Sequence, residues 1–509
     1  MFVSHQWAGC DHPDPYFSQF KVLQDALRNV MEGSSLISGT AFELYTGQQS
    51  LISAEDLCSM PLFIWYDYFS CPQSFHGEQS RLMAIDSIPA YVERCRFFVA
   101  LCPPIRHKTI DTVLNKQTWS KRGWCRLERA ARELSGLADT KNIEIQGARQ
   151  LAVAPIFDWV WAPVGEGHFS VAQDREKIAS VVRSMVFRKL HINLLQGNWH
   201  SYRLMLNLQR IQYRSLAIVP IEDVIPGFKS DASDPAAYAT AKFMYQNGFQ
   251  SLDERTPEGW SPICFAAVEG NAMLLSTLIE MRADPNDLVQ QSEPVLLLAP
   301  QTPLLHICAA LSHNEALQVL LAARADIGST DGFGSTALLW AAAVNNVEGI
   351  EILSQAGCDF KSPNMVGYSP FVAASVVGCI EAMTKLLPHA SQHELNLALH
   401  KTILHGSGSA DVMLILVNAG ADVNCQLHTP LISPFGILFS MLSIRNHWRQ
   451  STLSYYAYHH YAATPLMCSV ITGSFEATAV LLSAGACTEF RNARGCTVLD
   501  LARESCAPE

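Results

Sequence analysis

The second half of the chain repeats itself with a period of roughly 33 residues, and this periodicity restricts the fold more than any other feature. Asp326 and Asp359 lie 33 positions apart, as do Ala337 and Pro370. A unit of this length cannot bury its apolar face alone, so it stacks on copies of itself. The copies cover residues 259–286, 301–327, 334–360, 367–387, 410–424, 463–490 and 494–504. The sequence therefore predicts an all-α solenoid over residues 253–509.

The repeated unit resembles the ankyrin repeat. The segment "QTPLLHICAA" is similar to the TPLH tetrapeptide that opens the first helix of that family, and "GADVN" at 420–424 is similar to its closing hairpin. Thr or Ser before Pro also starts a helix on physical grounds, because the hydroxyl caps the helix and Pro fixes φ. Gly357, Gly420 and Gly485 suit a left-handed turn after the second helix. The resemblance implies about seven repeats whose concave face binds a protein partner.

Two stretches interrupt the register of the repeats. Residues 287–300 are inserted between copies, and residues 431–462 form a degenerate or looped-out unit. The second stretch includes "SYYAYHHYAA" at 454–463. This aromatic and histidine cluster has two interpretations: a patch for a partner, or side chains packed between repeats.

Residues 1–190 follow a different pattern, in which short apolar runs alternate with longer amphipathic stretches. The expected strands are 1–7, 62–69, 96–102 and 150–157, and the expected helices are 16–31, 78–94, 124–137 and 174–190. Strands separated by helices favour an α/β doubly wound parallel sheet covered on both faces. Such sheets bind ligands beyond the carboxyl ends of their strands. Residues 191–252 are helical in pattern and are expected to connect this domain to the repeats.

Composition narrows the class of protein. A formal charge of −11 without a basic cluster argues against nucleic-acid binding. The fifteen cysteines include no CxxC pair, which indicates reduced thiols in a core and a cytoplasmic location. The longest apolar run, 431–444, is too short for a membrane span and contains Pro and Gly, and no secretory leader is visible. Met1 lies inside the first expected strand, which leaves open whether further sequence precedes it.

Four motifs of the N-terminal half are similar, in their order, to the Toll/interleukin receptor (TIR) fold family. They are "FVSHQW" (2–7), "FIWYDYFSCPQ" (63–73), "IDSIPAYVERCRFFVALCP" (85–103) and "WSKRGWCRLERAARELS" (119–135). In that family the first strand ends in a Ser-containing motif, the second ends in an Asp and a proline-bearing loop, and a WCxxE helix follows the third. The segment "WYDYFSCPQ" also resembles the heterokaryon-incompatibility signature, a family of related architecture. The resemblance implies a TIR-like domain over residues 1–190 that serves in protein association.

The same resemblance implies a candidate catalytic residue. In enzymatically active TIR domains, a Glu four residues after a Trp on this helix assists cleavage of the nicotinamide–ribose bond of NAD, and the matching pair is Trp124 and Glu128. A carboxylate suits this reaction because departure of nicotinamide leaves an oxocarbenium-like sugar that an anion stabilises. The alternative is a solvated, charged helix face in an adaptor that catalyses nothing.

The end of the first expected strand would line the same crevice. The candidate substrate-binding residues are Ser4, His5, Gln6, Trp7, Asp67 and Trp124. Active relatives often carry a basic residue where Gln6 stands, so the resemblance supports pyrophosphate binding only weakly. Asp67 has the alternative role of capping the turn that follows it. Residues 70–77 match the loop through which TIR domains self-associate, or form a plain connection.

No metal or resident cofactor is expected. His5, Cys10 and His12 lie close together in the sequence, but no fourth ligand follows at a recognisable spacing. Three functional hypotheses therefore stand. The chain is an interaction or signalling scaffold that binds a partner through its repeats, an NAD glycohydrolase regulated through those repeats, or a non-catalytic nucleotide sensor.

Overall fold

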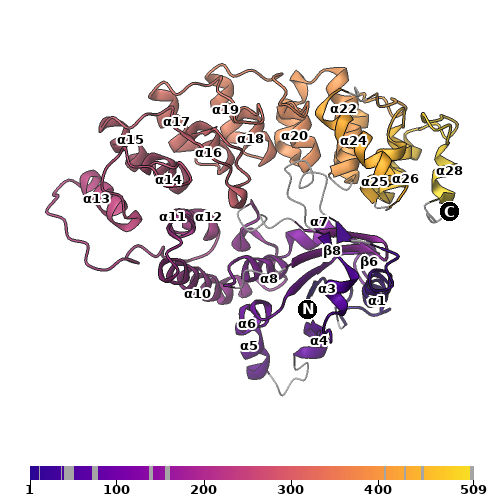
Figure 1. The fold of residues 1–509 in the computed structure, drawn as a ribbon, viewed down its shortest axis with the longest axis horizontal. Helices are drawn as coiled ribbons and strands as arrows, with labels where there is room; N and C mark the ends of the chain where they lie inside the picture. Colours follow the sequence, from indigo (N-terminus) through magenta and orange to yellow (C-terminus); the bar gives the residue numbers. More distant parts are fainter. Residues whose placement is uncertain are drawn as a thin grey trace. The chain divides into compact units, whose positions relative to one another are not determined.

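The computed structural model describes residues 1–10, 12–35, 37–38, 51–71, 78–136, 141–154, 161–405, 408–428, 432–448 and 452–504. The chain divides into two compact units, Met1–Lys229 with Pro294–Leu296, and Ser230–Glu293 with Leu297–Glu509. The division falls inside the expected connector 191–252. Helices α11 (Trp199–Asn207) and α12 (Gln209–Gln212) therefore belong to the first unit, and α13 (Pro235–Asn247) belongs to the second (Figure 1).

The first unit is built on a seven-stranded sheet in the order β3-β2-β9-β8-β5-β1-β4. The strands are β1 (Phe2–His5), β2 (Ile37–Ser38), β3 (Leu51–Ile52), β4 (Trp65–Tyr66), β5 (Phe97–Leu101), β8 (Lys141–Gly147) and β9 (Gln150–Val153). Strands β4, β1, β5 and β8 run parallel to one another, whereas β9 is antiparallel to β8 and β3 is antiparallel to β2. The prediction of a parallel sheet is right for these four strands and wrong for the whole sheet, which is mixed because a tight turn after Gly147 folds β9 back onto β8.

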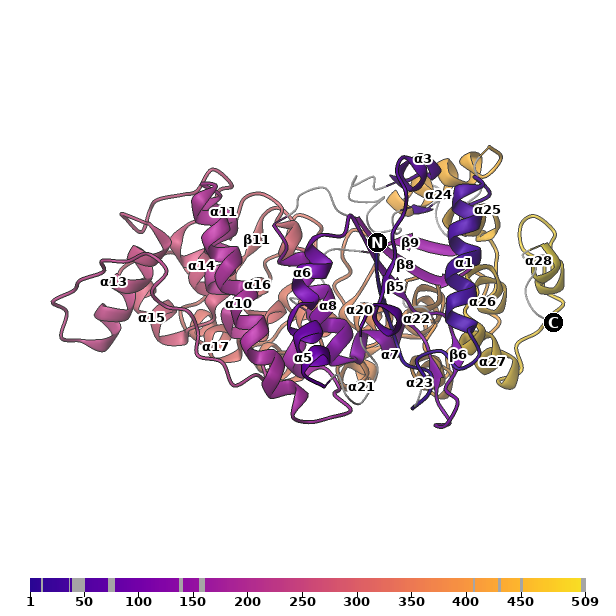
Figure 2. The same cartoon turned by 90° about the horizontal axis from the view of Figure 1, so that it is seen from below.

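Helices cover both faces of this sheet. Helix α1 (Ser18–Met31) places Leu23, Ala26 and Val30 on one side of its axis, where they join a buried cluster with Val3 and Val99. Helices α6 (Ile88–Glu93) and α8 (Gly123–Glu133) contact each other, and α8 contacts β1. Figure 2 shows α1 on one side of the strands and α6 and α8 on the other.

Several predicted elements of the first unit are confirmed within a few residues: β1, α1, β5, α8 and α10 (Asp174–Leu195). The expected helix 78–94 is instead two helices, α5 (Glu78–Asp86) and α6, because Pro89 lies in the first turn of α6 and lacks an N–H group. The expected strand 62–69 is reduced to β4, and α4 (Asp67–Ser70) begins directly after it. Residues 155–157 of the expected strand 150–157 lie outside the described residues.

The second unit is a stack of paired helices. The first helices of the pairs are α14 (Pro262–Glu269), α16 (Leu304–Ala310), α18 (Ala337–Ala343), α20 (Pro370–Val377), α22 (Gln392–His405), α26 (Pro465–Thr472) and α28 (Val498–Glu504). The second helices are α15 (Ala272–Glu280), α17 (Asn314–Ala322), α19 (Val347–Gln355), α21 (Ile380–Leu386), α23 (Ala410–Asn418) and α27 (Phe475–Ser483). Each first helix contacts the first helix of the next pair (Figure 1).

The sequence register fixes where these helices begin. Ala337 and Pro370, which occupy equivalent positions in successive copies of the repeat, are the first residues of α18 and α20. The three glycines expected after second helices all have positive φ, at 87° for Gly357, 92° for Gly420 and 81° for Gly485. The predicted repeat geometry is therefore confirmed at these helix starts and turns.

The two interruptions of the register also have structure. Residues 287–300 include β10 (Leu288–Val289), which pairs antiparallel with β11 (Thr302–Pro303). Residues 431–462 include α24 (Pro434–Arg445) and α25 (Thr452–His459). In the aromatic cluster, Tyr456 and His460 are buried, and Phe439 lies 4.7 Å from the His460 ring. These two side chains are therefore packed inside the unit and do not form a surface patch.

Candidate functional site

The carboxyl end of β1 is the point at which the connections of the sheet change direction. Strand β1 pairs with β4 on one side and with β5 on the other. After β1 the chain runs to β2 and β3 at the far edge of the sheet, and it then returns to β4 and β5, the two neighbours of β1. Sheets of this class bind ligands beyond the carboxyl ends of their strands at such a point. Ser4 and His5 are the last residues of β1, and Asp67 follows β4 at the same edge of the sheet.

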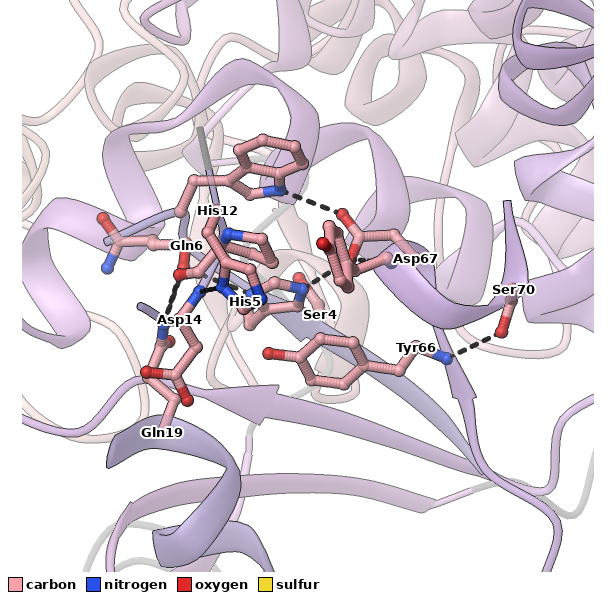
Figure 3. Close-up of polar contacts among 12 residues, drawn as sticks. Ser4, His5, Gln6, His12, Asp14, Gln19, Tyr66, Asp67 and Ser70 are labelled. Carbon is pink, nitrogen blue, oxygen red and sulfur yellow. Dashed lines mark hydrogen bonds and ion pairs between the residues drawn. The ribbon is translucent and has the colours of Figure 1, made fainter. Parts of the chain in front are cut away.

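His5, Trp7 and Asp67 form one hydrogen-bonded group at this edge. The Nε2 atom of His5 lies 2.7 Å from Asp67 Oδ1, and Trp7 Nε1 donates to Asp67 Oδ2 at 3.1 Å. Figure 3 shows the His5 ring pointing at Asp67. The same ring stacks on Tyr66, with centroids 4.0 Å apart. Burial alone would raise the pKa of Asp67, but the hydrogen bond and charge of His5 and the hydrogen bond from Trp7 hold that pKa below its usual value.

A second group joins Ser4 to Glu128 on the other face of the sheet. Trp119, on α7 (Lys116–Lys121), donates its Nε1–H to Ser4 Oγ at 3.1 Å. The Ser4 hydroxyl also lies near the Glu128 side chain on α8, where it acts to lower the pKa of Glu128. The Cys125 thiol, one turn earlier on α8, donates to the carbonyl oxygen of His5 at 3.8 Å. Helices α7 and α8 therefore each donate one side-chain hydrogen bond to the last residues of β1, from Trp119 and from Cys125.

The environment of Glu128 favours the protonated carboxylic acid. Burial raises the pKa of Glu128 to about 8, and the negative charge of Asp67 acts in the same direction. The Ser4 hydroxyl and the Arg122 guanidinium oppose that shift. Residue Glu128 as a whole is of intermediate exposure, whereas its carboxyl group is desolvated. Two carboxyl groups with opposite pKa shifts, Asp67 and Glu128, therefore lie near the carboxyl end of β1, an arrangement typical of functional sites.

Gln6 and Trp124 are engaged in fixing the scaffold. Gln6 is buried, and its Nε2 atom donates to the carbonyl oxygen of Asn115 at 3.0 Å. The Gln6 carbonyl oxygen accepts from Gln19 Nε2 at 2.8 Å (Figure 3). Trp124 Nε1 donates to Asp174 Oδ2 at 3.2 Å. Of the six predicted substrate-binding residues, the structure thus groups His5, Trp7 and Asp67, places Ser4 beside Glu128, and ties the other two to neighbouring elements.

Three residues of this site were missed by sequence reasoning. Trp119 reaches Ser4 across 115 positions of sequence, and Arg122 precedes α8 as its N-cap residue. Cys71 lies near both carboxyl groups. Burial raises the pKa of its thiol, and the negative charges of Asp67 and Glu128 raise it further. Trp119 and Arg122 lie in the segment "WSKRGWC", but the sequence does not show that Trp119 contacts Ser4 or that Arg122 lies near Glu128. Residues 72–77 of the predicted self-association loop lie outside the described residues.

Metal ligation has no support among the residues that the structure describes, which contain no group of three or more His, Cys, Asp or Glu that could hold an ion. His12 Nδ1 accepts the Asp14 N–H at 3.0 Å, and the Cys10 thiol lies 3.3 Å from the Thr109 hydroxyl. His12 and Cys10, two of the three residues considered as metal ligands in the sequence, therefore have polar partners within the protein.

The repeats present a second candidate surface, formed by the finger loops between successive helix pairs. Main-chain hydrogen bonds join neighbouring fingers, from Gly332 N to Pro300 O at 2.7 Å and from Met365 N to Phe333 O at 2.9 Å. Buried Asp331 shapes its finger by accepting the N–H groups of Phe333 and Ser335. The side chain of Met365 is exposed at the tip of the next finger. The fingers thus form a row connected by main-chain hydrogen bonds, with the apolar side chain of Met365 exposed on it.

Comparisons with known proteins identify the repeats. The family model described as "Ankyrin repeats (3 copies)" matches residues 305–398. The human protein "Transient receptor potential cation channel subfamily A member 1" is 25% identical over 183 residues, which are 36% of this chain and 16% of that protein. The human ASB11 ankyrin repeat domain is similar with a TM-score of 0.35 and 21% identity, covering 48% of this chain and 91% of that domain.

The chain therefore contains ankyrin repeats, and it spans about a sixth of the curated relative that it matches. Among the helices of the described residues, none is both long and apolar enough to cross a membrane. The TIR-like relationship of the first unit stays a prediction from its motifs.

Proposed function

We propose that this chain is an interaction protein whose ankyrin repeats bind a protein partner along their row of fingers. The observation that carries the proposal is the regular register of the repeats, which aligns α18 with α20 and joins the fingers before them through main-chain hydrogen bonds. A rigid row of loops with exposed side chains offers an extended surface that loses little entropy on binding. Ankyrin repeats support a protein-binding role.

A substitution at a finger tip tests this proposal. The full chain is used to capture proteins from an extract, and the captured set is compared with that of Met365→Glu. Because the exposed Met365 would contact the partner, a charge there should weaken binding at least tenfold, about 1.4 kcal/mol or more. The matched control is Met273→Glu on the outer helix α15, which should keep the captured set. Equal capture by both variants would count against the finger surface.

The first unit is proposed to be TIR-like and to serve in association with other proteins. Its motifs and the four parallel strands around β1 support this assignment. An alternative proposal for the same unit is NAD glycohydrolysis. The specific observation in its favour is that Ser4, Asp67 and Glu128 lie near one another at the carboxyl end of β1.

The proposed reaction needs an anion beside the ribose. The bond between C1′ and the nicotinamide nitrogen breaks with its electron pair leaving on neutral nicotinamide, and water then adds to C1′ and loses a proton. Ionised Glu128 would stabilise the oxocarbenium-like sugar between these steps. Because the pKa of Glu128 lies near 8, the rate of nicotinamide release should increase as the pH rises from 7 to 9.

Nicotinamide release by concentrated, purified full chain tests this alternative. Glu128→Ala should abolish release, whereas Glu315→Ala, an exposed carboxylate on α17, should leave it unchanged. Equal release by wild type and Glu128→Ala would remove Glu128 from the mechanism. If wild type releases no nicotinamide, titration calorimetry with NAD distinguishes a nucleotide sensor, which binds it, from an adaptor, which does not.

A further inference from the structure

Helix α24 carries a row of apolar side chains on its exposed face. The exposed fractions are 47% for Ile437, 65% for Met441, 57% for Ile444 and 78% for Trp448, which follows the helix end. Their spacing of four, three and four residues places them along one edge of a helix. Phe439 and Leu442, on the opposite side, are buried, and Phe439 packs against Tyr456 at 5.9 Å. The exposed row is therefore additional to the face that holds α24 in the unit.

Basic groups flank this row on both sides. Arg445 follows Ile444 on one flank of α24. On the other flank, the Arg494 guanidinium donates to Ser443 Oγ at 3.4 Å and lies 4.1 Å from the centre of the Tyr458 ring. These two contacts hold the Arg494 charge beside the row while its side chain stays exposed.

The surrounding sequence contains no negative charge. Residues 423–475 include no Asp or Glu, although the whole chain has 47 such residues among 509. The segment itself adds no repulsion to an acidic ligand, which would pair with Arg445 and Arg494. The Glu504 carboxylate, which the fold brings to this segment, accepts a hydrogen bond from Tyr455 at 2.8 Å. A second copy of α24 would bring basic groups and no acidic ones, so charge complementarity disfavours pairing between copies.

The spacing of the row indicates the shape of the ligand. A four-three-four repeat is the seam against which one amphipathic helix packs with its own apolar ridge. The helical part of the row, from Ile437 to Ile444, extends over about 10 Å, which matches about two turns of a partner helix, and Trp448 lies beyond it. A lipid surface would instead be met by a broad apolar face with many cations around it.

We propose that α24 docks an amphipathic helix of a partner protein that carries acidic side chains on both sides of its apolar ridge. This proposal rests on the protein-binding function of the repeats, but it assigns a site separate from the finger tips. It predicts that affinity depends on the apolar row and falls with salt concentration, because the flanking ion pairs are exposed.

The test uses the full chain and two synthetic peptides of about three heptads with the same leucine seam, one flanked by Glu and the other by Lys. Fluorescence anisotropy should show the Glu peptide binding at least about tenfold more tightly than the Lys peptide. Met441→Ser with Ile444→Ser should weaken the Glu peptide about tenfold or more, because both side chains would leave water on binding. Met273→Ser is the matched control and should bind like wild type. Circular dichroism checks that the variants are folded.

Several outcomes would overturn the proposal. Equal affinity for the two peptides, or no binding of either, would contradict the acidic helix. Binding to phosphatidylserine vesicles that the double variant abolishes would assign the row to a membrane surface. A concentration-dependent dimer that the double variant abolishes would assign it to a second copy. None of these results depends on Met365→Glu, so this proposal can fail while the finger surface stands.

Discussion

At the scale of single residues, Glu128 is a carboxyl group whose protonation near neutral pH is changed by the fold. Its carboxyl group is desolvated beside β1 and lies near the anion Asp67, and both effects raise the pKa of Glu128 to about 8. The folded protein therefore keeps a proton on Glu128 at pH values where the unfolded chain, with a pKa of 4.5, has lost it. The free energy of unfolding must then fall as the pH rises from about 4.5 to about 8.

Glu128→Gln should remove this dependence, because the amide does not ionise. At pH 5 the variant and wild type should unfold at similar urea concentrations. At pH 9 the variant should be more stable, by roughly 1 to 4 kcal/mol, since wild type then carries a buried charge. Urea titrations at pH 5, 7 and 9, followed by tryptophan fluorescence, measure the difference. A difference that stays constant across these pH values would show that Glu128 is not desolvated.

At the scale of elements, the turn after each second helix shows how the repeats tolerate sequence variation. Gly357 occupies this turn with φ of 87°, and Arg324, at the equivalent position one repeat earlier, adopts φ of 63°. A side chain in this left-handed conformation costs roughly 1 to 2 kcal/mol, whereas glycine costs roughly 0.5 to 1 kcal/mol of additional chain entropy.

Arg324→Gly should therefore stabilise the second unit, by roughly 0.5 to 1 kcal/mol. Gly357→Ala is the opposite change in the equivalent turn, and it should destabilise by roughly 1 kcal/mol through the backbone alone, because no atom lies within 4 Å of the added Cβ. Urea unfolding followed by circular dichroism measures both. If the two substitutions shift the midpoint in the same direction, the turn conformation does not govern the effect.

The finger loops provide a second prediction at this scale. Asp331 Oδ1 accepts from Phe333 N at 2.9 Å and from Ser335 N at 2.8 Å, and Oδ2 accepts from Trp340 Nε1 at 3.0 Å. Asp331→Ala should cost roughly 1 to 3 kcal/mol in unfolding experiments, because buried donors lose their acceptor. Asp331→Asn should retain most of the stability, because Asn364 makes the equivalent backbone contacts one repeat later. Equal losses in the two variants would contradict this account.

The same elements show why some of the fold could be predicted and some could not. A hydroxyl residue followed by Pro marks the starts of α20 and α26, and this signal made both helices predictable from the sequence. Helix α22 lacks that signal and was missed. Strand β8 was missed because its buried Asn142 and Glu144 break the apolar pattern of a central strand. Ser4 and Asp67 could be expected at the site because they end adjacent strands.

At the scale of the whole molecule, the chain combines a candidate site in one compact unit with ankyrin repeats, the proposed binding surface, in the other. The first unit has its own buried hydrophobic cluster, which includes Leu23 of α1 and Ile145 of β8. The repeats of the second unit are stabilised by contacts between neighbouring helices. If the repeats regulate the first unit, binding of a partner to the repeats must change the affinity of the first unit for its ligand. Such a coupling is reciprocal.

This reciprocity gives a prediction for the NAD hypothesis. The Glu128→Gln chain, which should bind NAD without cleaving it, is titrated with NAD in the absence and presence of a captured partner. If the repeats regulate NAD binding, the partner should change the Kd for NAD by a factor of about 5 to 150. NAD should then change the Kd of the partner by the same factor. Titration calorimetry measures both constants, and Met365→Glu should remove the coupling by preventing partner binding. A factor of one in both titrations would mean that the two units act independently.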